Sequence, residues 1–433
     1  MAQVFPFEME SAMKQSLWSM LGLAGAVCVA GVSLQAEAQL SPTGWARQFG
    51  GTSEDQAQAV AVAGGSVYVA GHTANALGAQ PYAGSQDIFV AKYDTAGNAQ
   101  WVRLLGTPER DRATAVATDA AGNVYVVGHT FGGFDFYVNA GGLDSFVAKY
   151  DAQGNRLWLR QFGTQMDDFA TAVAVTDKVF VAGYTGGDFV NGGNPFQYDV
   201  YVALYDTAGN PYWLQQYGSP NGDVAAGIAV TPSHDIYVAG ETSGSMDGTT
   251  TPTGSDIFVM KLDILGTLQW ARQLDASGND HGTGVAVGPD GGVYVSGYTF
   301  GQPDGNVSNG LFDALLARYD GAGTRQWSRL VGGPGADYAH GVTVAANNTI
   351  VLAGRVGDSL DGLPHAGWDD VFLARFDALG TKLSSRVLGT PTIEVTRGVA
   401  VDAAGNAFVA GYTYGALTGV PSAGSYDAFL IRF

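Results

Sequence analysis

The stretch WVRLLGTPERDRATAVATDAAGNVYVVGHT, residues 101–130, returns as WLRQFGTQMDDFATAVAVTDKVFVAGYT at residues 158–185. Both copies keep a Trp, a Gly five residues after it, an acidic residue ten residues after it, and a closing Gly-x-Thr. Variants of this phrase begin at seven positions spaced 55–57 residues apart, which are Trp45, Trp101, Trp158, Trp213, Trp270, Trp327 and Ser384. A fixed period of this length is the signature of a repeat architecture, so the repeat decides the fold.

Each repeat contains four segments with the pattern of a β-strand. The segment ATAVAVTD, residues 170–177, alternates Ala with Thr and Val, a period of two with one very small face. In the preceding repeat, the turn sequence DAAGN, residues 119–123, separates the equivalent segment from the next strand. Apolar residues on both faces of the later strands predict sheets that are covered on both sides.

Seven units of four strands predict an all-β fold, a seven-bladed β-propeller with four antiparallel strands per blade. The Ala-rich strand is expected innermost, where the blades crowd the axis, and the Trp strand outermost. The chain ends with YDAFLIRF, residues 426–433, which is a third strand, whereas GWARQFG, residues 44–50, is a lone fourth strand. We expect the N-terminal strand to pair with the C-terminal blade, which closes the ring and removes two open sheet edges.

The N-terminal region predicts export. Residues 14–38 contain one Lys, an apolar run from Leu17 to Leu34, and Ala36-Glu37-Ala38, which is the layout of a secretory signal with a cleavage site. The run is too short and wrongly flanked for a transmembrane segment. We therefore expect a signal peptide over residues 1–38, with Met13 as an alternative start, and one propeller domain over residues 39–433. Cys28, the one cysteine, would leave with the signal.

The formal charge of −19 makes the surface acidic. Such a surface repels phosphate backbones, so no nucleic-acid partner is expected.

The repeats, written for example as DSFVAKYDAQGNRLWLRQFG at residues 144–163, resemble the bacterial SBBP repeat family, named for its seven-bladed β-propellers, across residues 45–433. The resemblance implies an exported propeller and supplies no common catalytic residue. The sequence departs from the pattern at Ser384 in place of Trp, at Val356 in place of Thr, and at Asp275 in place of Gly.

One acidic residue stands before the predicted inner strand of every repeat, and a closed propeller would gather all seven around one mouth of its channel. Crowded carboxylates can recruit a hard cation such as Ca²⁺. Alternatively, each can accept hydrogen bonds within its own loop. The structural interpretation is favoured because the acid recurs in every copy. Apart from this possible Ca²⁺, no cofactor is expected. We call these seven residues the ring acids: Asp55, Asp111, Asp168, Asp223, Asp280, Asp337 and Glu394.

Other candidate residues break or follow the repeat. His281 and His340 follow ring acids in adjacent units, and they are a candidate for metal binding or catalysis beside the alternative of packing. A second acidic column opens the third strands and invites the same two interpretations as the ring acids. Aromatic residues in segments 131–143 and 186–198 could stack on sugar rings, although loop-packing anchors are favoured.

Three functions are compatible with these features. The leading one is a secreted or cell-surface, non-enzymatic propeller, expected to be a monomer, that presents its loop face to a glycan or protein partner. The alternative is an extracellular carbohydrate-active hydrolase or lyase that uses carboxylates at the channel mouth. The third is an envelope protein without a discrete ligand.

Overall fold

The computed structural model describes residues 44–190, 197–250, 254–274, 276, 278–308, 310–417, 419 and 422–433. The expected signal peptide over residues 1–38, with Met13 and Cys28, lies outside the described residues. Asp275 also lies outside them.

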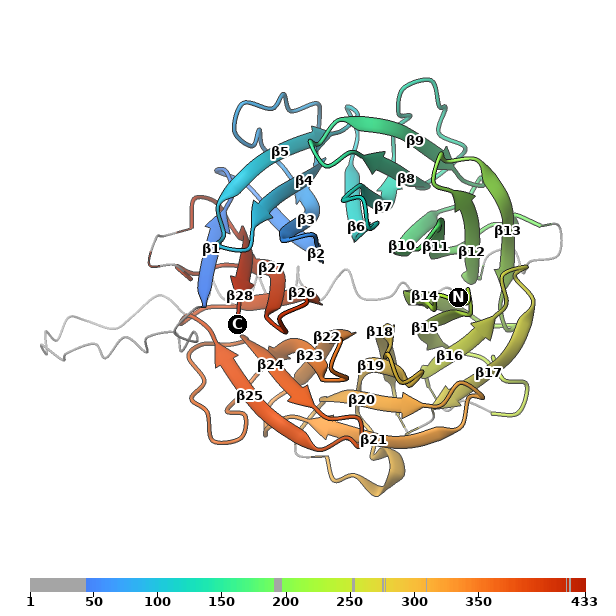
Figure 1. Cartoon of the computed structure of the whole chain (residues 1–433), viewed down its shortest axis with the longest axis vertical. Helices are drawn as coiled ribbons and strands as arrows, with labels where there is room; N and C mark the ends of the chain where they lie inside the picture. The colour runs from blue at the N-terminus through green and yellow to red at the C-terminus, as the bar shows by residue number, and fades with distance from the viewer. Residues whose placement is uncertain are drawn as a thin grey trace, which may run out of the picture. The chain divides into compact units, whose positions relative to one another are not determined.

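Seven sheets of four antiparallel strands stand around a central axis, which confirms the predicted seven-bladed propeller (Figure 1). The inner strands are β2 (Asp55–Ala63), β6 (Asp111–Thr118), β10 (Asp168–Val175), β14 (Asp223–Val230), β18 (Asp280–Val287), β22 (Asp337–Val344) and β26 (Glu394–Val401). The second strands are β3 (Ser66–Thr73), β7 (Val124–Thr130), β11 (Lys178–Thr185), β15 (Ile236–Thr242), β19 (Val293–Thr299), β23 (Ile350–Val356) and β27 (Ala407–Thr413).

The outer half of each blade consists of two further strands. The third strands are β4 (Asp87–Asp94), β8 (Asp144–Tyr150), β12 (Asp199–Asp206), β16 (Asp256–Leu262), β20 (Asp313–Tyr319), β24 (Asp370–Phe376) and β28 (Asp427–Arg432). The outermost strands are β5 (Ala99–Leu105), β9 (Arg156–Phe162), β13 (Pro211–Tyr217), β17 (Leu268–Leu274), β21 (Arg325–Val331), β25 (Lys382–Leu388) and β1 (Trp45–Phe49). Blades 1 to 7 follow this order, so blade 1 is β2–β5 and blade 7 is β26, β27, β28 and β1. A single turn of 3₁₀ helix, η1 (Pro303–Gly305), lies in blade 5.

The seventh blade is closed by the two ends of the propeller chain, as predicted. Strand β1 pairs antiparallel with β28, in a register that runs from Trp45 opposite Arg432 to Phe49 opposite Ala428. Figure 1 shows β1 beside β28 at the outer edge of this blade. No sheet edge is therefore left open between the first and last blades.

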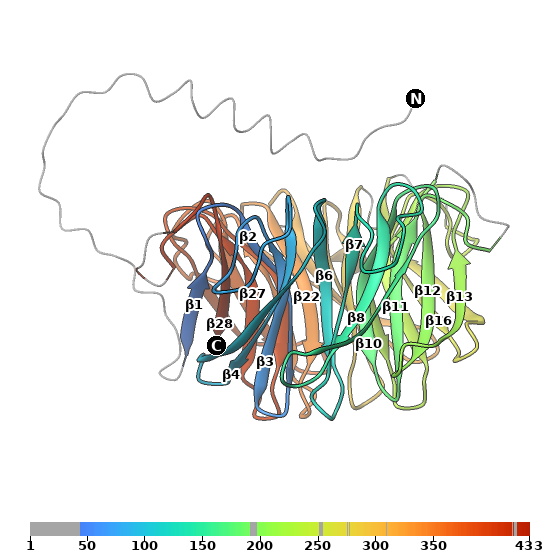
Figure 2. The same cartoon turned by 90° about the horizontal axis from the view of Figure 1, so that it is seen from above.

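The small face of the inner strands is explained by how closely these strands approach one another. A Cβ atom on Gly227 would lie 2.8 Å from the Cα atom of Gly284, so the backbones of β14 and β18 are in contact. The apolar cores lie farther out, between neighbouring blades: Tyr68 and Ile88 of blade 1 pack in one cluster with Phe146 of blade 2. Figure 2 shows the strands running from one face of the disc to the other.

The Trp that recurs in six of the seven units joins neighbouring blades. Trp101 of blade 1 donates its indole N–H to the carbonyl of Ala152 in blade 2, at 3.1 Å. Arg103 donates to the carbonyl of Gly154 at 2.9 Å and stacks over the Trp101 ring. Gly154 has a φ of +81°, and a Cβ atom there would lie 2.9 Å from the indole, so the turn requires Gly.

The same contact explains why blade 6 has Ser384 where the other units have Trp. The partner of this position would be a turn between the third and fourth strands of blade 7. Those strands are β28 and β1, which are not consecutive in the chain and therefore are not joined by such a turn. An indole at this position would have no turn to contact.

Candidate functional site

The ring acids lie inside the protein at the end of the channel where the inner strands begin. All seven side chains have no exposed surface. Each carboxylate accepts a hydrogen bond of 2.5–2.9 Å from the backbone N–H four residues earlier, donated by Gly51, Thr107, Thr164, Ser219, Ala276, Gly333 and Thr390 in chain order. The structure therefore places these carboxylates in their own loops, where they cap the turn that enters each blade.

The second carboxylate oxygen is bonded to the end of the neighbouring strand. Thr130 donates its hydroxyl to Asp111, and Thr413 donates to Glu394 at 2.6 Å. The Thr130 hydroxyl in turn accepts the N–H of Gly132 at 2.8 Å. In blades 2, 5 and 7 the ring acid thus connects the entry of the inner strand to the exit of the second strand, which supports the structural interpretation.

Blade 6 lacks this hydroxyl, because Val356 occupies the Thr position. Asp337 instead accepts the N–H of Gly357 at 3.2 Å. We expect Val356→Thr to stabilise the protein by about 1 kcal/mol at pH 8, since an isosteric side chain would add one donor to a buried carboxylate. Urea denaturation of the variant and of the parent measures this difference. A variant no more stable than its parent would show that the hydroxyl adds nothing at this position.

The second acidic column is built in the same way. Asp144 accepts the N–H of Ala140 at 3.0 Å and the side-chain amide of Gln161 at 2.8 Å. Gly163 lies between this carboxylate and a ring acid: a Cβ atom there would lie 2.2 Å from Asp144 Oδ1 and 3.0 Å from Asp168 Oδ2. The column, like the ring acids, is buried, and it consists of Asp87, Asp144, Asp199, Asp256, Asp313, Asp370 and Asp427.

Burial raises the pKa of six of the ring acids. Desolvation raises the pKa of Asp111, Asp168 and Asp337 to about 6, against the opposing effect of their hydrogen bonds. The charge of Asp144 contributes to the raised pKa of Asp168, because the two carboxylates face the same glycine. Within the part of the chain that the structure describes, no three His, Cys, Asp or Glu residues are grouped to hold a metal ion.

The structure gives His281 and His340 different neighbours. His281 bonds through Nδ1 to Glu241 of blade 4 and stacks on Tyr298 at 4.7 Å. His340 is half-buried and lies 6.4 Å from the ring of Tyr338. Burial, with the charges of nearby arginines, lowers the pKa of His340 well below its usual value.

The loop aromatics divide into anchors and exposed side chains. Phe134 packs edge-on against Phe146 at 5.4 Å, and Phe189 does the same against Tyr201. Both are anchors of the kind that the sequence favoured. Phe136, one of the candidate aromatic residues of segment 131–143, is fully exposed, and Val138, which was not singled out from the sequence, is 88% exposed.

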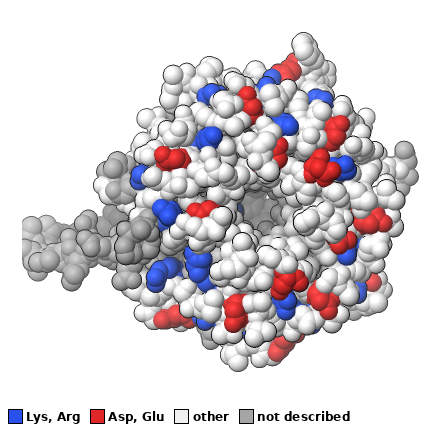
Figure 3. Space-filling view, viewed as in Figure 1, with Lys and Arg blue, Asp and Glu red and all other residues white. Residues whose placement is uncertain are grey.

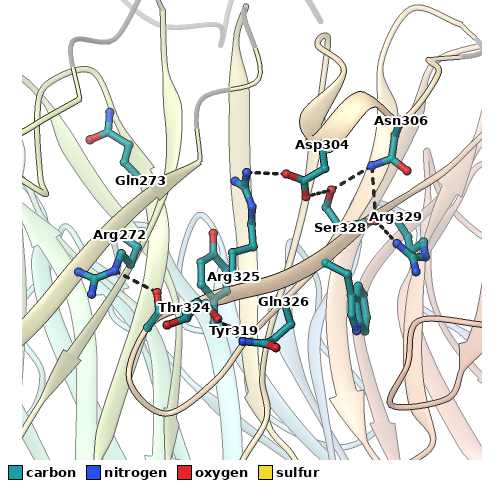
Figure 4. A pocket seen from close by; sticks show the side chains of 12 residues that line it. Arg272, Gln273, Asp304, Asn306, Tyr319, Thr324, Arg325, Gln326, Ser328 and Arg329 are labelled. Atoms are coloured by element: carbon teal, nitrogen blue, oxygen red, sulfur yellow. Dashed lines mark hydrogen bonds and ion pairs between the residues drawn. The ribbon is translucent and has the colours of Figure 1, made fainter.

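A pocket of about 690 Å³ opens at the outer rim between blades 4 and 5 (Figure 4). Asp304 accepts hydrogen bonds from Arg325 and Ser328, both at 2.6 Å, and Arg272 donates to the carbonyl of Gly323 at 3.0 Å. The charged groups of the pocket therefore have partners within its own wall. The Asp304–Arg325 pair also recurs in blades 2 and 6, as Asp135–Arg156 and Asp361–Lys382.

Comparison with known proteins confirms the family resemblance at two places. The family model described as a β-propeller repeat, SBBP, matches residues 100–135 and 385–417. The protein carries SBBP β-propeller repeats. No helix among its described residues is long and apolar enough to cross a membrane.

Two curated proteins resemble the SBBP-repeat chain. Regulatory protein FlaEY of Caulobacter vibrioides is 28% identical over 407 residues, which are 82% of this chain and 42% of that protein. An uncharacterized WD repeat-containing protein of Acanthamoeba polyphaga mimivirus is 23% identical over 64% of this chain and 21% of its own length. The chain thus spans less than half the length of either relative.

Three solved structures are similar at low sequence identity. The Neurospora crassa Pan2 WD40 domain is 13% identical, with 74% of this chain and 88% of that chain covered and a TM-score of 0.39. YCF48 bound to D1 peptide is 10% identical, with 94% and 99% covered and a TM-score of 0.49. A luciferin-regenerating enzyme is 10% identical, with 74% and 90% covered and a TM-score of 0.37.

Proposed function

We propose that this protein is a non-enzymatic binding scaffold whose partner is a protein that docks on the loops of blades 2 and 3. The observation that carries the proposal is the exposure of apolar side chains at the tip of the loop over residues 131–143. Phe136 and Val138 are 102% and 88% exposed, whereas Phe134 in the same loop is buried. A loop that is already anchored does not need further apolar side chains, and exposed ones in a group mark an interaction surface.

The neighbouring loops also expose apolar side chains. Met166 and Tyr198 are 39% and 40% exposed, and both adjoin Gly186 at the start of the blade 3 loop. Leu143 donates its N–H to Asp167 at 2.9 Å, which ties the blade 2 loop to the loop that carries Met166. We define the apolar loop patch as Phe136, Val138, Met166 and Tyr198.

A protein partner is favoured over a glycan by the chemistry of the loop tip. Sugar-binding sites combine an aromatic ring with several convergent polar groups. The nearest charged groups at the tip, Asp135 and Arg156, are paired with each other at 2.7 Å. The aliphatic Val138 beside Phe136 offers no hydrogen bond, as expected for an apolar protein contact.

The enzyme alternative is disfavoured by the burial of the ring acids. A catalytic carboxyl must come within hydrogen-bond reach of its substrate. Each ring acid has no exposed surface and is bonded to its own loop. The relative FlaEY is named a regulatory protein, which is compatible with a binding role.

The test compares Phe136→Ser/Val138→Ser with a matched control, Leu265→Ser/Leu379→Ser. The control residues are 73% and 74% exposed but lie in turns between third and outermost strands. A partner captured by cross-linking is purified, and its affinity for each variant is measured by calorimetry. We expect the loop variant to bind at least about tenfold more weakly and the control to bind normally, because two apolar anchors contribute about 1–2 kcal/mol each.

A partner that binds both variants equally would contradict the proposal. Binding of polysaccharides on a glycan array, or their turnover, would favour a glycan-binding protein or an enzyme instead.

We further propose that the scaffold works outside the cytoplasm, after cleavage near Gln39. The sequence pattern of residues 14–38 is the support for this proposal. N-terminal sequencing of the protein from its native host tests it, and protein that retains Cys28 would contradict it.

A further inference from the structure

The seven-fold repeat is broken at one level of the channel. Every inner strand has a β-bulge three residues after its ring acid. The bulged residue is uncharged in blades 1 to 5, and it is His340 in blade 6 and Arg397 in blade 7. The seven bulged residues are Gln58, Thr114, Thr171, Ala226, Thr283, His340 and Arg397. The inner strands of the adjacent blades 6 and 7 therefore bring a basic residue to a position that has an uncharged residue in the other five blades.

Arg397 has few partners for its five N–H groups. Among the residues that the structure describes, no carboxylate forms an ion pair with it. Its Nε is buried without a hydrogen-bond partner, and one Nη donates to the Tyr412 hydroxyl at 3.4 Å. The guanidinium carbon lies 5.5 Å from the Tyr412 ring. The side chain is half-buried, and a guanidinium so placed is short of acceptors.

His72 of blade 1 is a second buried side chain without a partner, on the side of β3 that packs against blade 2. The side chain is 1% exposed, and neither ring nitrogen has a hydrogen-bond partner among the described residues. Buried polar side chains in proteins nearly always have a partner. The Nε2 of His340 is likewise buried without one.

The charges of the neighbouring arginines act on these histidines. After burial, the charges of Arg112, His129 and Arg397 lower the pKa of His72, and those of Arg355 and Arg397 lower the pKa of His340. Arg397 therefore lies close enough to act on both blade 1 and blade 6. Arginine charges therefore gather around these two histidines, although the protein as a whole is strongly acidic.

Two other arginines near these histidines already have side-chain acceptors. Arg112 donates to Gln86 at 2.7 Å, and Arg355 donates to Asp369 at 3.0 Å. The ring acids of blades 1 and 7 are bonded to the N–H groups of Gly51 and Thr390. Among these three arginines, Arg397 is the one without a carboxylate or amide acceptor in the described residues.

We propose that this end of the channel binds an oxyanion, the carboxylate or phosphate group of a ligand, between blades 6, 7 and 1. Arg397 is the main contact, since a guanidinium presents a fork of donors that matches two oxygens of either group. The Tyr412 hydroxyl and the buried Nε2 of His340 are the further donors. Figure 3 shows the hollow at the centre of the ring of blades from the opposite face, where the inner strands end. The site is separate from the apolar loop patch, so it does not depend on the proposed protein partner.

The test titrates the protein with inorganic phosphate and, separately, with acetate, with sodium chloride added to hold the ionic strength constant. We expect one of the two anions to raise the melting temperature by a few degrees, in a manner that saturates, with binding seen by calorimetry. A stronger effect of phosphate identifies a phosphate site, and a stronger effect of acetate identifies a carboxylate site.

Three variants complete the test. Arg397→Gln should lower the affinity for the anion at least tenfold. Arg397→Lys keeps the charge but lacks the forked donors of the guanidinium, so it should lower the affinity by an intermediate amount. Arg386→Gln is the matched control, because Arg386 is exposed on the outermost strand β25. Circular dichroism confirms that each variant is folded. A response that is unsaturable, or that is equal in all variants, would overturn the proposal.

Discussion

A chain that begins at Gly51, and so lacks β1, is expected to lose most of its thermal stability and to aggregate. The deletion removes five backbone pairs with β28, together with the packing of Trp45 on Phe408 and of Phe49 on Phe89. At about 1 kcal/mol for each backbone pair and about 2–3 kcal/mol for each of the two aromatic side chains, the loss sums to roughly 10 kcal/mol.

The deletion also changes the surface of blade 7. Strand β28, which contains the buried residues Phe429, Leu430 and Ile431, would then present an unpaired edge. An unpaired apolar edge is a template for pairing with other chains. Calorimetry and light scattering measure the two effects, and the parent for comparison is the chain that begins at Gln39. A deletion that melts like this parent and stays monodisperse would contradict closure by β1.

Removal of one ring acid is expected to have the next largest effect. Asp111→Ala should destabilise the protein by about 3 kcal/mol at pH 5, because it leaves buried donors without an acceptor. Those donors are the backbone N–H of Thr107 and the hydroxyl of Thr130. Asp111→Asn retains one acceptor oxygen and should cost about 1 kcal/mol. Chemical denaturation of both variants measures the series.

The ionisation of Asp111 gives this series a dependence on pH. Burial raises its pKa to about 6 from an ordinary value of 3.8, so the folded state holds the proton more tightly than the unfolded chain does. The stability that this group contributes is complete below pH 3.8 and is lost as the pH rises to about 6. A shift of this size corresponds to about 3 kcal/mol.

The Asn variant cannot ionise and therefore lacks this loss. The advantage of the wild type over Asp111→Asn, in free energy of unfolding, should fall between pH 4 and pH 6 and then stay constant. The comparison removes the opposite effect of His72, His129 and His340, whose lowered pKa values make both proteins more stable as the pH rises. A constant difference across this range would show that Asp111 does not titrate as a buried acid.

The fold could be predicted because the repeat writes the same local pattern seven times. Period-two alternation identifies strands, and the displaced strand at Trp45 requires closure of the last blade. Even the departure at Ser384 follows from this closure, since its partner turn does not exist.

The candidate sites could be predicted only in part. Residue type and spacing are the same whether a ring acid faces the channel or its own loop, and only the backbone path of each loop decides between the two. Phe134 and Phe136 are two residues apart in one loop, yet one is buried and the other is fully exposed, because strand periodicity does not hold in a loop. Arg397 carried a readable signal, since the same position is uncharged in blades 1 to 5.

The central claim is that the ring acids stabilise the loop that enters each blade and do not form a cation site. The most direct test is the melting temperature of the wild type and of Asp111→Asn/Asp168→Asn/Asp223→Asn, with about 5 mM Ca²⁺ or with a chelator, since a bound ion stabilises by mass action. We predict that calcium leaves the melting temperature of both proteins unchanged. A rise with calcium in the wild type that disappears in the triple variant would contradict the claim.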